Sequence, residues 1–353
     1  MPTSLHQRSV PVDAAKTAAI FGTLLIHASA AGGFSGAAGS PGWTAALFWN
    51  ALLRCAVPVF FMCSGALLLP PEKEVTVRTI WRKYIPRILI ALLFWAAAYD
   101  GWQLLLAFRR TGVLEAAALQ KAAADWLLFR HKSHLYYLHI ILLVYALLPL
   151  TRLFAAKADR RLLRYGLAVW FLLGILLPTA RFFPPLSLLT GIPAQYPINL
   201  TWSAVGYGVL GYALSQEAQN RRSRHFLLLY LAGFCVTFGG TLGLSLAKGS
   251  LYEGLLNGNS LGVCLQAAGV FGFCASRFAD WERCRLTETV SRASFCVYLT
   301  HVFFLEFLNA RGIAAGLFPN AWVIPALALA CFAAGFLAWV ILRRVPWARK
   351  YLI

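Results

Sequence analysis

The chain has very little charge for its length. Only 13% of its 353 residues are charged, and 13 Asp and Glu stand against 32 Lys and Arg. Hydrophobic residues make up 59% of the chain and the mean hydropathy is +0.65, which is more apolar than a typical soluble domain. Uncharged runs at 17–53, 182–216 and 312–342 exceed the roughly 20 residues that cross a bilayer as a helix. This composition indicates a polytopic membrane protein.

Several patterns that carry common chemistries are missing. The sequence has no Gly-rich phosphate loop, no Gly-x-Ser-x-Gly elbow and no paired Asp arrangement for metal-dependent transfer. Its eight cysteines form no Cys-x-x-Cys pair and no Cys/His spacing typical of zinc. We interpret them as small apolar residues rather than as a disulfide framework or a metal site. Any chemistry must therefore come from polar side chains within the membrane helices.

Hydropathy predicts an all-α fold with about ten transmembrane helices. We expect a single transmembrane domain over residues 1–353 with no appended soluble domain, and helices around a polar central cavity. The expected helices lie near residues 11–31, 44–69, 85–106, 135–151, 165–180, 201–215, 226–247, 258–276, 292–309 and 321–342.

The net charge of +19 follows this topology. With the N-terminus in the cytoplasm, the inner segments hold 22 of the 32 Lys and Arg, the outer loops hold eight, and Lys16 and Arg54 lie within helices. This asymmetry fits the positive-inside rule and places both termini in the cytoplasm. The basic charge is explained by membrane orientation, so membrane lipids are expected partners and nucleic acid is not.

The first segment permits a second interpretation. A preceding Arg, an apolar run and Ala-Ser-Ala at 28–30 also resemble a cleavable signal peptide. Against this, Asp13 and Lys16 crowd the apolar run, and His27 lies just before the supposed cleavage site. Loss of this helix would also leave an odd number of expected helices, which would no longer fit the distribution of basic residues between the two sides of the membrane. We expect an uncleaved first helix.

Two outer loops stand out between the helices. Residues 107–133 form the longest polar stretch and are amphipathic, so this segment is expected to lie along the membrane surface. Residues 181–199 are rich in Pro and aromatic residues, which suits an interfacial lid and a simple connector equally well.

The first helix carries a polar stripe. Lys16 and His27 are eleven residues apart, which is about three turns, so both project from one face roughly 16 Å apart along the axis. Asp13 can pair with Lys16, and Thr23 joins the stripe. Such a stripe must face a bundle interior or a water-filled cavity. Alternatively, Asp13 and Lys16 snorkel to the headgroups and His27 is a hydrogen-bonded structural residue.

The second helix carries an Arg near the depth of His27. An intramembrane charge such as Arg54 by default marks a functional or paired site, and the alternative is a structural ion pair with Glu306 of the ninth helix. Pro58 is expected to kink the same helix and to free backbone carbonyls.

Two further histidines lie in or at the ends of helices. His134 lies at the outer end of the fourth helix, with His139 just beyond it, and His301 lies in the ninth. Imidazoles carry protons near neutral pH and serve as general bases, although each of these two alone is also compatible with a structural role.

These segments resemble a known family. DAAKTAAIFGTLLIH resembles the opening helix of the bacterial membrane-bound acyltransferase-3 family, with Asp13, Lys16 and His27 at its three characteristic positions. RCAVPVFFMCSGALLL is similar to the second-helix pattern, and HLYYLHIILLVYALLPL is similar to the His-Leu-Trp-Phe-Leu segment, with Tyr136 where Trp is common. GYGVLGYAL and SFCVYLTH resemble later segments of the same family. The resemblance spans nearly the whole chain, in order.

The resemblance implies an O-acyltransferase of the bacterial cytoplasmic membrane. Such a protein transfers an acyl group, usually acetyl, from cytoplasmic acyl-coenzyme A to a hydroxyl of a cell-surface glycan or its lipid-linked precursor. Acyl-coenzyme A is then a substrate, and no permanently bound cofactor is expected. The expected catalytic residues are His27 and Arg54; the donor-binding residues are Lys16, Arg82, Lys83 and Arg87; and the supporting residues are Asp13, His134, Tyr136, Tyr137, Ser294, His301 and Glu306.

One departure concerns the cations at the inner face. Many family members have Arg-x-x-Arg before the third helix, whereas this chain reads RKYIPR, so Arg82, Lys83 and Arg87 are placed differently. They are either contacts for the donor or determinants of topology only. The distance of roughly 16 Å from Lys16 to His27 is of the order of a pantetheine arm.

Two rival functions remain open at this point. Buried His and Arg residues also suit a proton-coupled exporter of a glycan or a small organic acid. A non-catalytic assembly subunit would have no need of the polar stripe. The sequence leaves open the acceptor sugar and hydroxyl, the acyl chain length, the leaflet of transfer and the oligomeric state. A covalent acyl-His relay and general-base catalysis are equally open.

Overall fold

The computed structural model describes residues 9–183, 186–191, 193 and 195–353, and these contain no β-strand. The longer helices are α1 (Val10–Ala30), α2 (Pro41–Leu52), α3 (Ala56–Leu68), α5 (Ile85–Thr111), α6 (Ala116–Leu127), α7 (Tyr136–Ala146), α8 (Leu148–Lys157), α9 (Arg160–Phe171), α11 (Leu200–Glu217), α12 (Ser223–Lys248), α13 (Leu261–Arg277), α14 (Arg285–Ala310) and α15 (Asn320–Leu342). Shorter pieces are α4 (Val77–Thr79), η1 (Ile80–Tyr84), η2 (Ser133–Leu135), η3 (Leu172–Leu176), α10 (Leu177–Ala180), η4 (Leu186–Gly191), η5 (Ala218–Asn220), η6 (Gly254–Leu256) and α16 (Pro346–Tyr351).

The all-α membrane fold is confirmed, but a count of ten spans is not. A helix lies at each of the ten expected places. Seven helical segments of the described chain are long and apolar enough to cross a membrane, and an eighth is added if the bent pair Ser133–Ala146 and Leu148–Lys157 is one span. Helix α1, which carries an Asp, a Lys and a His, and the 18-residue α11 are not among them. Part of the Pro-rich 181–199 loop lies outside the described residues.

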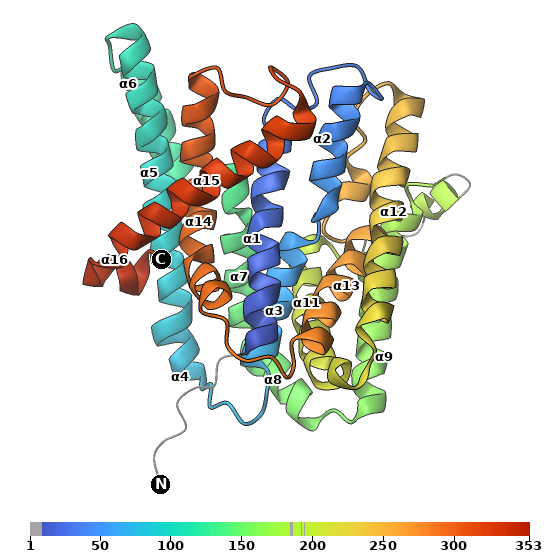
Figure 1. Ribbon diagram of the computed structural model, residues 1–353. Coiled ribbons are helices and arrows are strands. Elements are labelled where there is room, and N and C mark those ends of the chain that lie inside the picture. Colours follow the sequence, from blue (N-terminus) through green and yellow to red (C-terminus); the bar gives the residue numbers. More distant parts are fainter. Residues whose placement is uncertain (1–8, 184–185, 192, 194) are drawn as a thin grey trace.

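Helix α1 lies at the centre of the bundle (Figure 1). It packs against α2, α3, α13, α14 and α15. Ala15, Ala19 and Ile20 are almost fully buried in these contacts, and the two small Ala side chains let neighbouring helices approach closely. The polar residues of α1 are therefore held inside the protein rather than presented to lipid.

The expected second helix is broken rather than kinked. Helix α2 ends at Leu52 and α3 begins at Ala56, so Arg54 lies in a turn between two helices. Pro58 lies in the first turn of α3, where the missing N–H removes no helical hydrogen bond. The carbonyls of Ala51 and Leu52 accept hydrogen bonds from the Gln266 amide (2.8 Å) and the Tyr230 hydroxyl (2.7 Å). The two carbonyls at the break thus find hydrogen-bond donors in side chains of α12 and α13.

Helices α3 and α11 cross at backbone contact. A Cβ atom added at Gly65 would lie 1.8 Å from the carbonyl oxygen of Gly208, and one at Gly211 would lie 2.2 Å from that of Met62. Only glycine permits such an approach. This crossing fixes α3, whose Phe60 and Ser64 line the cavity described below.

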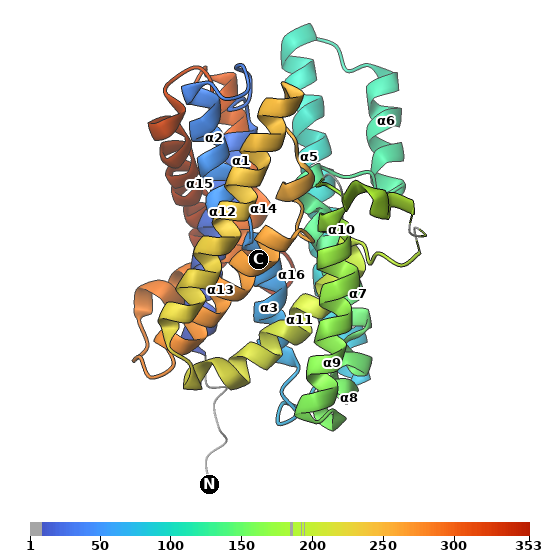
Figure 2. The ribbon, with the colours of Figure 1, turned by 90° about the vertical axis from the view of Figure 1, so that its right-hand side faces the viewer.

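Residues 107–133 contain the end of α5 and the amphipathic helix α6. Helix α5 extends to Thr111, and α6 then folds back along α5 (Figure 2). The indole of Trp126 donates a hydrogen bond to the carbonyl of Leu93, 3.0 Å away, which fastens α6 to α5. Helix α6 has no buried residue, so the expected position of this segment along the membrane surface stays a prediction.

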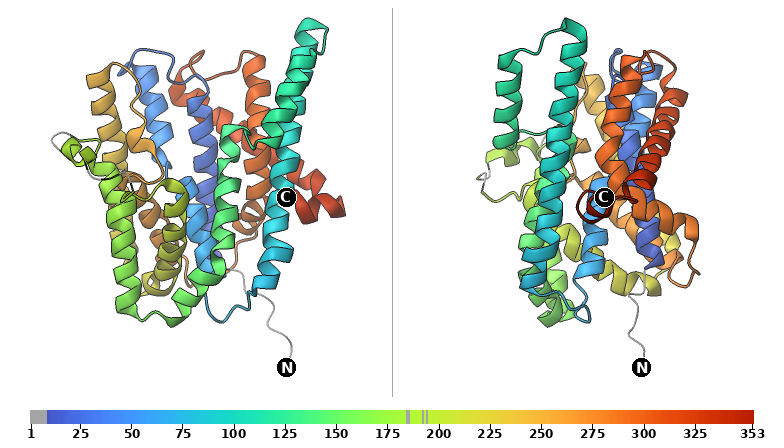
Figure 3. Two further views of the ribbon diagram at one scale, coloured as in Figure 1. Left: turned by 180° about the vertical axis from the view of Figure 1, so that it is seen from behind. Right: turned by 90° about the vertical axis from the view of Figure 1, so that its left-hand side faces the viewer.

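The C-terminal segment is docked on the bundle. Helix α15 runs obliquely across one side, and α16 packs against α5 (Figures 1 and 3). Trp95 donates to the carbonyl of Leu352 (3.2 Å) and Arg87 donates to that of Ile353 (2.6 Å).

Lys73 and Arg152, two of the basic residues assigned to the inner side, also donate hydrogen bonds to backbone carbonyls. Lys73 donates to the carbonyl of Leu67 (2.8 Å), and Arg152 donates to the carbonyls of Leu68, Pro70 and Lys73. Burial, reinforced by Arg152, lowers the pKa of Lys73. These contacts satisfy carbonyls at the C-terminal end of α3 that have no helical partner.

Candidate functional site: a histidine cluster and a basic cavity

Three histidines from different helices meet in the core. The ring centroids of His27 (α1) and His301 (α14) are 4.9 Å apart, those of His134 (η2) and His301 are 5.5 Å apart, and those of His27 and His134 are 6.2 Å apart. His134 and His301 are buried, whereas His27 is half-buried. The two histidines that the sequence suggested only individually thus form one cluster with His27.

Tyr298 is hydrogen-bonded to both His134 and His301, and it orients the imidazole of His301. Its hydroxyl donates to the carbonyl of His134, and its own carbonyl accepts a hydrogen bond from Nδ1 of His301 at 2.6 Å. In neutral His301 this donor leaves Nε2 as the basic nitrogen. Nε2 of His301 and Nε2 of His134 are buried and have no hydrogen-bond partner among the described residues. Such nitrogens suit transient binding of a proton or a reacting group.

Arg54 lies beside the cluster. Its Nε donates to the carbonyl of Leu256 (2.6 Å) and its Nη1 donates to Oδ1 of Asn50 (3.0 Å). The guanidinium is close enough to interact electrostatically with His27 and with Tyr136, whose side chain is exposed. The alternative interpretation of Arg54, an ion pair with Glu306, is wrong, because Glu306 accepts from Lys132 (2.8 Å) and Gln103 (2.8 Å) instead. Arg54 therefore keeps donors available to a ligand.

A basic cavity of about 290 Å³, the central cavity, lies towards the other end of α1. Lys16 and Arg87 supply its positive charge and Ser294 supplies a hydroxyl. Its lining residues are Lys16, Phe60, Ser64, Leu68, Tyr84, Arg87, Ile88, Tyr137, Ile141, Tyr145, Ser294, Phe295 and Tyr298.

Tyr137 and Tyr298 link the central cavity to the histidine cluster. Both line the cavity, and their ring centroids are 5.5 Å apart. The ring of Tyr298 also lies 6.1 Å from that of His301 and 6.2 Å from that of His134. Two aromatic side chains thus lie between the cavity that holds Lys16 and the imidazoles.

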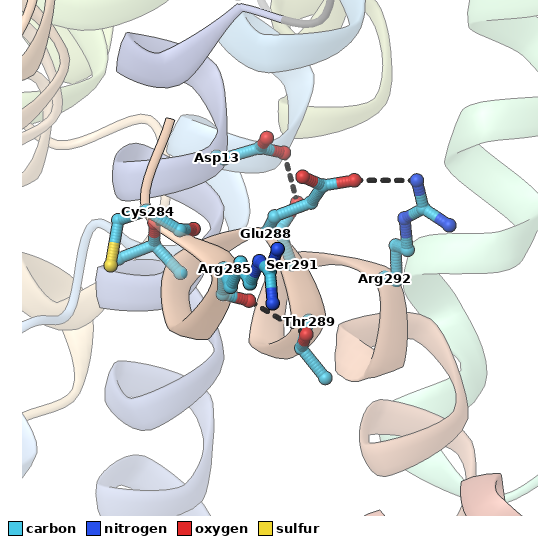
Figure 4. Close-up of polar contacts among 8 residues, drawn as sticks. Asp13, Cys284, Arg285, Glu288, Thr289, Ser291 and Arg292 are labelled. Atoms are coloured by element: carbon cyan, nitrogen blue, oxygen red, sulfur yellow. Dashed lines mark hydrogen bonds and ion pairs between the residues drawn. The ribbon is translucent and has the colours of Figure 1, made fainter. Parts of the chain in front are cut away.

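Of the other residues expected to bind the donor or to support the site, some line the central cavity and others lie elsewhere. Arg82 and Lys83 are exposed on η1 and do not line the central cavity, whereas Arg87 does. The carboxylate of Asp13 accepts a hydrogen bond from Ser291 of α14 (2.6 Å; Figure 4), and no ion pair between described residues joins it to Lys16. Glu306 and its partner Lys132 are joined away from Arg54, at the far end of α14.

Sequence reasoning missed Asn50. This buried side chain donates to the hydroxyl of Ser29 (2.9 Å) and the carbonyl of Ile26 (3.3 Å), and it accepts from Arg54. It therefore ties the guanidinium to α1 next to His27. An Asn four residues before an intramembrane Arg was the available signal, since on the single helix expected from the sequence this spacing places the two side chains on one face.

We expect Asn50→Ala to lower kcat by about tenfold while leaving KM for the acyl donor nearly unchanged. The substitution removes the acceptor that positions Arg54 and leaves the donor cavity intact; a hydrogen bond to a charged group contributes roughly 1.5–3 kcal/mol. Steady-state kinetics of the purified protein measure both constants. Asn220→Ala, in η5, is the matched control. Equal falls in both variants, or an effect on KM alone, would contradict a positioning role for Asn50.

The comparisons with known proteins identify a family. A family model described as an acyltransferase domain matches residues 11–344. No curated protein and no solved structure matches the chain.

Proposed function

Because the chain belongs to the acyltransferase-3 family, we propose that this membrane acyltransferase moves an acetyl group from cytoplasmic acyl-coenzyme A to a hydroxyl of a cell-surface polysaccharide or its lipid-linked precursor. We place it in the bacterial cytoplasmic membrane with both termini in the cytoplasm, as the distribution of basic residues indicates.

The observation that carries the proposal is the meeting of His27, His134 and His301 beside Arg54. Acyl transfer to a hydroxyl needs a base for the hydroxyl proton and a donor of positive charge for the oxyanion that forms on the thioester carbonyl. An imidazole supplies the first and a guanidinium supplies the second.

In the proposed reaction, His27 takes the proton of the acceptor hydroxyl as its oxygen attacks the thioester carbonyl. Arg54 stabilises the oxyanion, the C–S bond then breaks, and the departing thiolate takes the proton from the imidazolium. In the alternative route His27 attacks the carbonyl itself, the C–S bond breaks with release of the coenzyme A thiolate, and the acyl-imidazole passes its acyl group to the acceptor oxygen. The hydroxyl proton then passes through His134 or His301 to the thiolate. In both routes His134 and His301 hold the ring of His27.

The two substrates approach from different directions in this proposal. The pantetheine arm of the donor enters through the central cavity past Lys16 and Ser294, and its thioester passes Tyr137 and Tyr298 to reach His27. The acceptor approaches from the side of Arg54, where Tyr136 is exposed. Membership of an acyltransferase family favours this function over the export of a glycan or an organic acid.

The test uses purified protein in lipid nanodiscs with radiolabelled acetyl-coenzyme A. We expect release of free coenzyme A and transfer of label to isolated lipid-linked glycan. Mass spectrometry of surface glycans from deletion and complemented cells identifies the acetylated hydroxyl. Identical acetylation in deletion cells, together with no donor turnover in nanodiscs, would contradict the proposal.

A further inference from the structure

A second basic pocket adjoins the central cavity. It has a volume of about 510 Å³ and lies among α5, α14, α15 and the C-terminal segment. We call it the arginine pocket because five of its lining residues are Arg87, Arg285, Arg292, Arg343 and Arg349. Of the described residues that line it, only Glu288 is acidic, and Glu288 is engaged with Arg292 (Figure 4).

The charge of this pocket is concentrated and accessible. All five arginines are exposed, although they come from four separate segments of the chain. Like charges brought together repel one another, so such a cluster is stabilised by an anion that bridges them. Guanidinium groups bind phosphate through paired N–H donors, which makes a phosphorylated ligand the best match.

The arginine pocket adjoins the central cavity. Arg87 and Phe295 line both. The Nη2 atom of Arg87 donates to the carbonyl of Ile353, which fixes this guanidinium at the junction. A ligand with its phosphorylated end in the arginine pocket would therefore need only to pass Arg87 and Phe295 for a narrow chain to reach Ser294 and Tyr298 in the central cavity.

The arginine pocket also offers apolar surface for a flat group. Trp339 is buried beneath it, and the guanidinium of Arg343 lies 4.6 Å from the centre of the Trp339 ring. Phe295 contributes a further half-buried ring. A planar base with adjacent phosphates matches both the apolar surface and the positive charge of this lining.

From this adjacency and the five arginines we infer that the arginine pocket binds the phosphorylated nucleotide end of the acyl donor, with Arg285 and Arg349 as phosphate ligands. The inference rests on the proposed function for the identity of the donor. It assigns the phosphate contacts to this pocket rather than to Arg82 and Lys83 of η1, which do not line it.

The first test measures binding alone. Adenosine 3′,5′-bisphosphate is titrated into the full chain in nanodiscs of zwitterionic lipid. We expect Arg285→Gln and Arg349→Gln each to raise its Kd by about tenfold or more, as expected when a charge-assisted hydrogen bond to phosphate is lost. Arg344→Gln, an exposed neighbour that does not line the pocket, should bind as the wild type does. Equal Kd values in all four proteins would overturn the inference.

The second test separates nucleotide from lipid. The titration is repeated in nanodiscs that contain an anionic phospholipid. If the bisphosphate still binds in these nanodiscs, the nucleotide site is supported. If the bisphosphate no longer binds, and the wild type retains the anionic lipid while Arg285→Gln releases it, the arginines bind a lipid headgroup and the inference is overturned.

Kinetics separate this inference from the proposed function. With acetyl-coenzyme A, the Arg285→Gln and Arg349→Gln proteins should show kcat/KM lowered by about tenfold or more, mainly through KM. With S-acetyl-pantetheine, which lacks the nucleotide, the loss should be less than about twofold. A wild type that binds the bisphosphate but transfers no acyl group would refute the proposed function and leave the phosphate site standing. Transfer that responds equally to both donors in the variants would refute the site and leave the function standing.

Discussion

Replacing His27 by Ala abolishes acyl transfer, with an expected fall in kcat of about 10³-fold or more. General-base catalysis alone contributes typically 10²–10⁴-fold, and a nucleophilic role would make the loss larger. The change should leave the membrane abundance and the melting temperature of the protein close to wild type, because His27 is only half-buried. Donor hydrolysis and glycan acetylation are measured on the same preparations.

His131→Ala is the matched control for this loss. His131 is half-buried and stacks on His139, with ring centroids 5.3 Å apart, away from the three-histidine cluster. It should retain full activity. Acetylation that persists in His27→Ala, or falls equally in His131→Ala, would remove His27 from the mechanism. Label that remains covalently bound to wild-type protein after rapid quenching, but not to His27→Ala, would favour the acyl-His route.

The second large effect is on folding. Gly65→Ala places a Cβ atom 1.8 Å from the carbonyl oxygen of Gly208. Because that obstacle is backbone, no rotamer change relieves it, and α3 must move away from α11. We expect the free energy of unfolding to fall by roughly 3 kcal/mol or more, with most of the protein lost from the monodisperse fraction after extraction. Size-exclusion chromatography and thermal unfolding measure both effects.

Gly239→Ala is the control for the glycine crossing. Gly239 lies in α12, and an added Cβ atom there meets nothing within 4 Å. Alanine has the higher helix propensity, so this change should be neutral or slightly stabilising. A melting temperature for Gly65→Ala that matches that of Gly239→Ala would mean that α3 and α11 are not in backbone contact.

The sequence predicted the polar stripe well because helical periodicity is a local property. Lys16 faces the central cavity and His27 faces the histidine cluster, as the spacing of eleven residues indicates. The cluster itself was only partly predictable. His134 and His301 were candidates individually, but their meeting with His27 depends on how η2 and α14 pack against α1, which no local pattern specifies.

The predictions that the structure corrects all depend on contacts between residues far apart in the chain. The apolar run through Arg54 reads as one helix, because the side chains of Tyr230 and Gln266 that satisfy its broken backbone are about 180 and 215 residues away in the chain. Likewise, the partner of Glu306 was decided by long-range packing, which brought Lys132 to it. Long-range contacts also decided that Arg87 lines the central cavity and Arg82 does not.

The most direct test of the central claim is a structure of the protein in lipid nanodiscs with an acetyl-coenzyme A analogue whose thioester sulfur is replaced by methylene. The account predicts density for the pantetheine arm in the central cavity beside Lys16 and Ser294, with the acyl carbonyl past Tyr298 and next to the His27 ring. An analogue bound elsewhere, or an acyl end turned away from the three imidazoles, would contradict it.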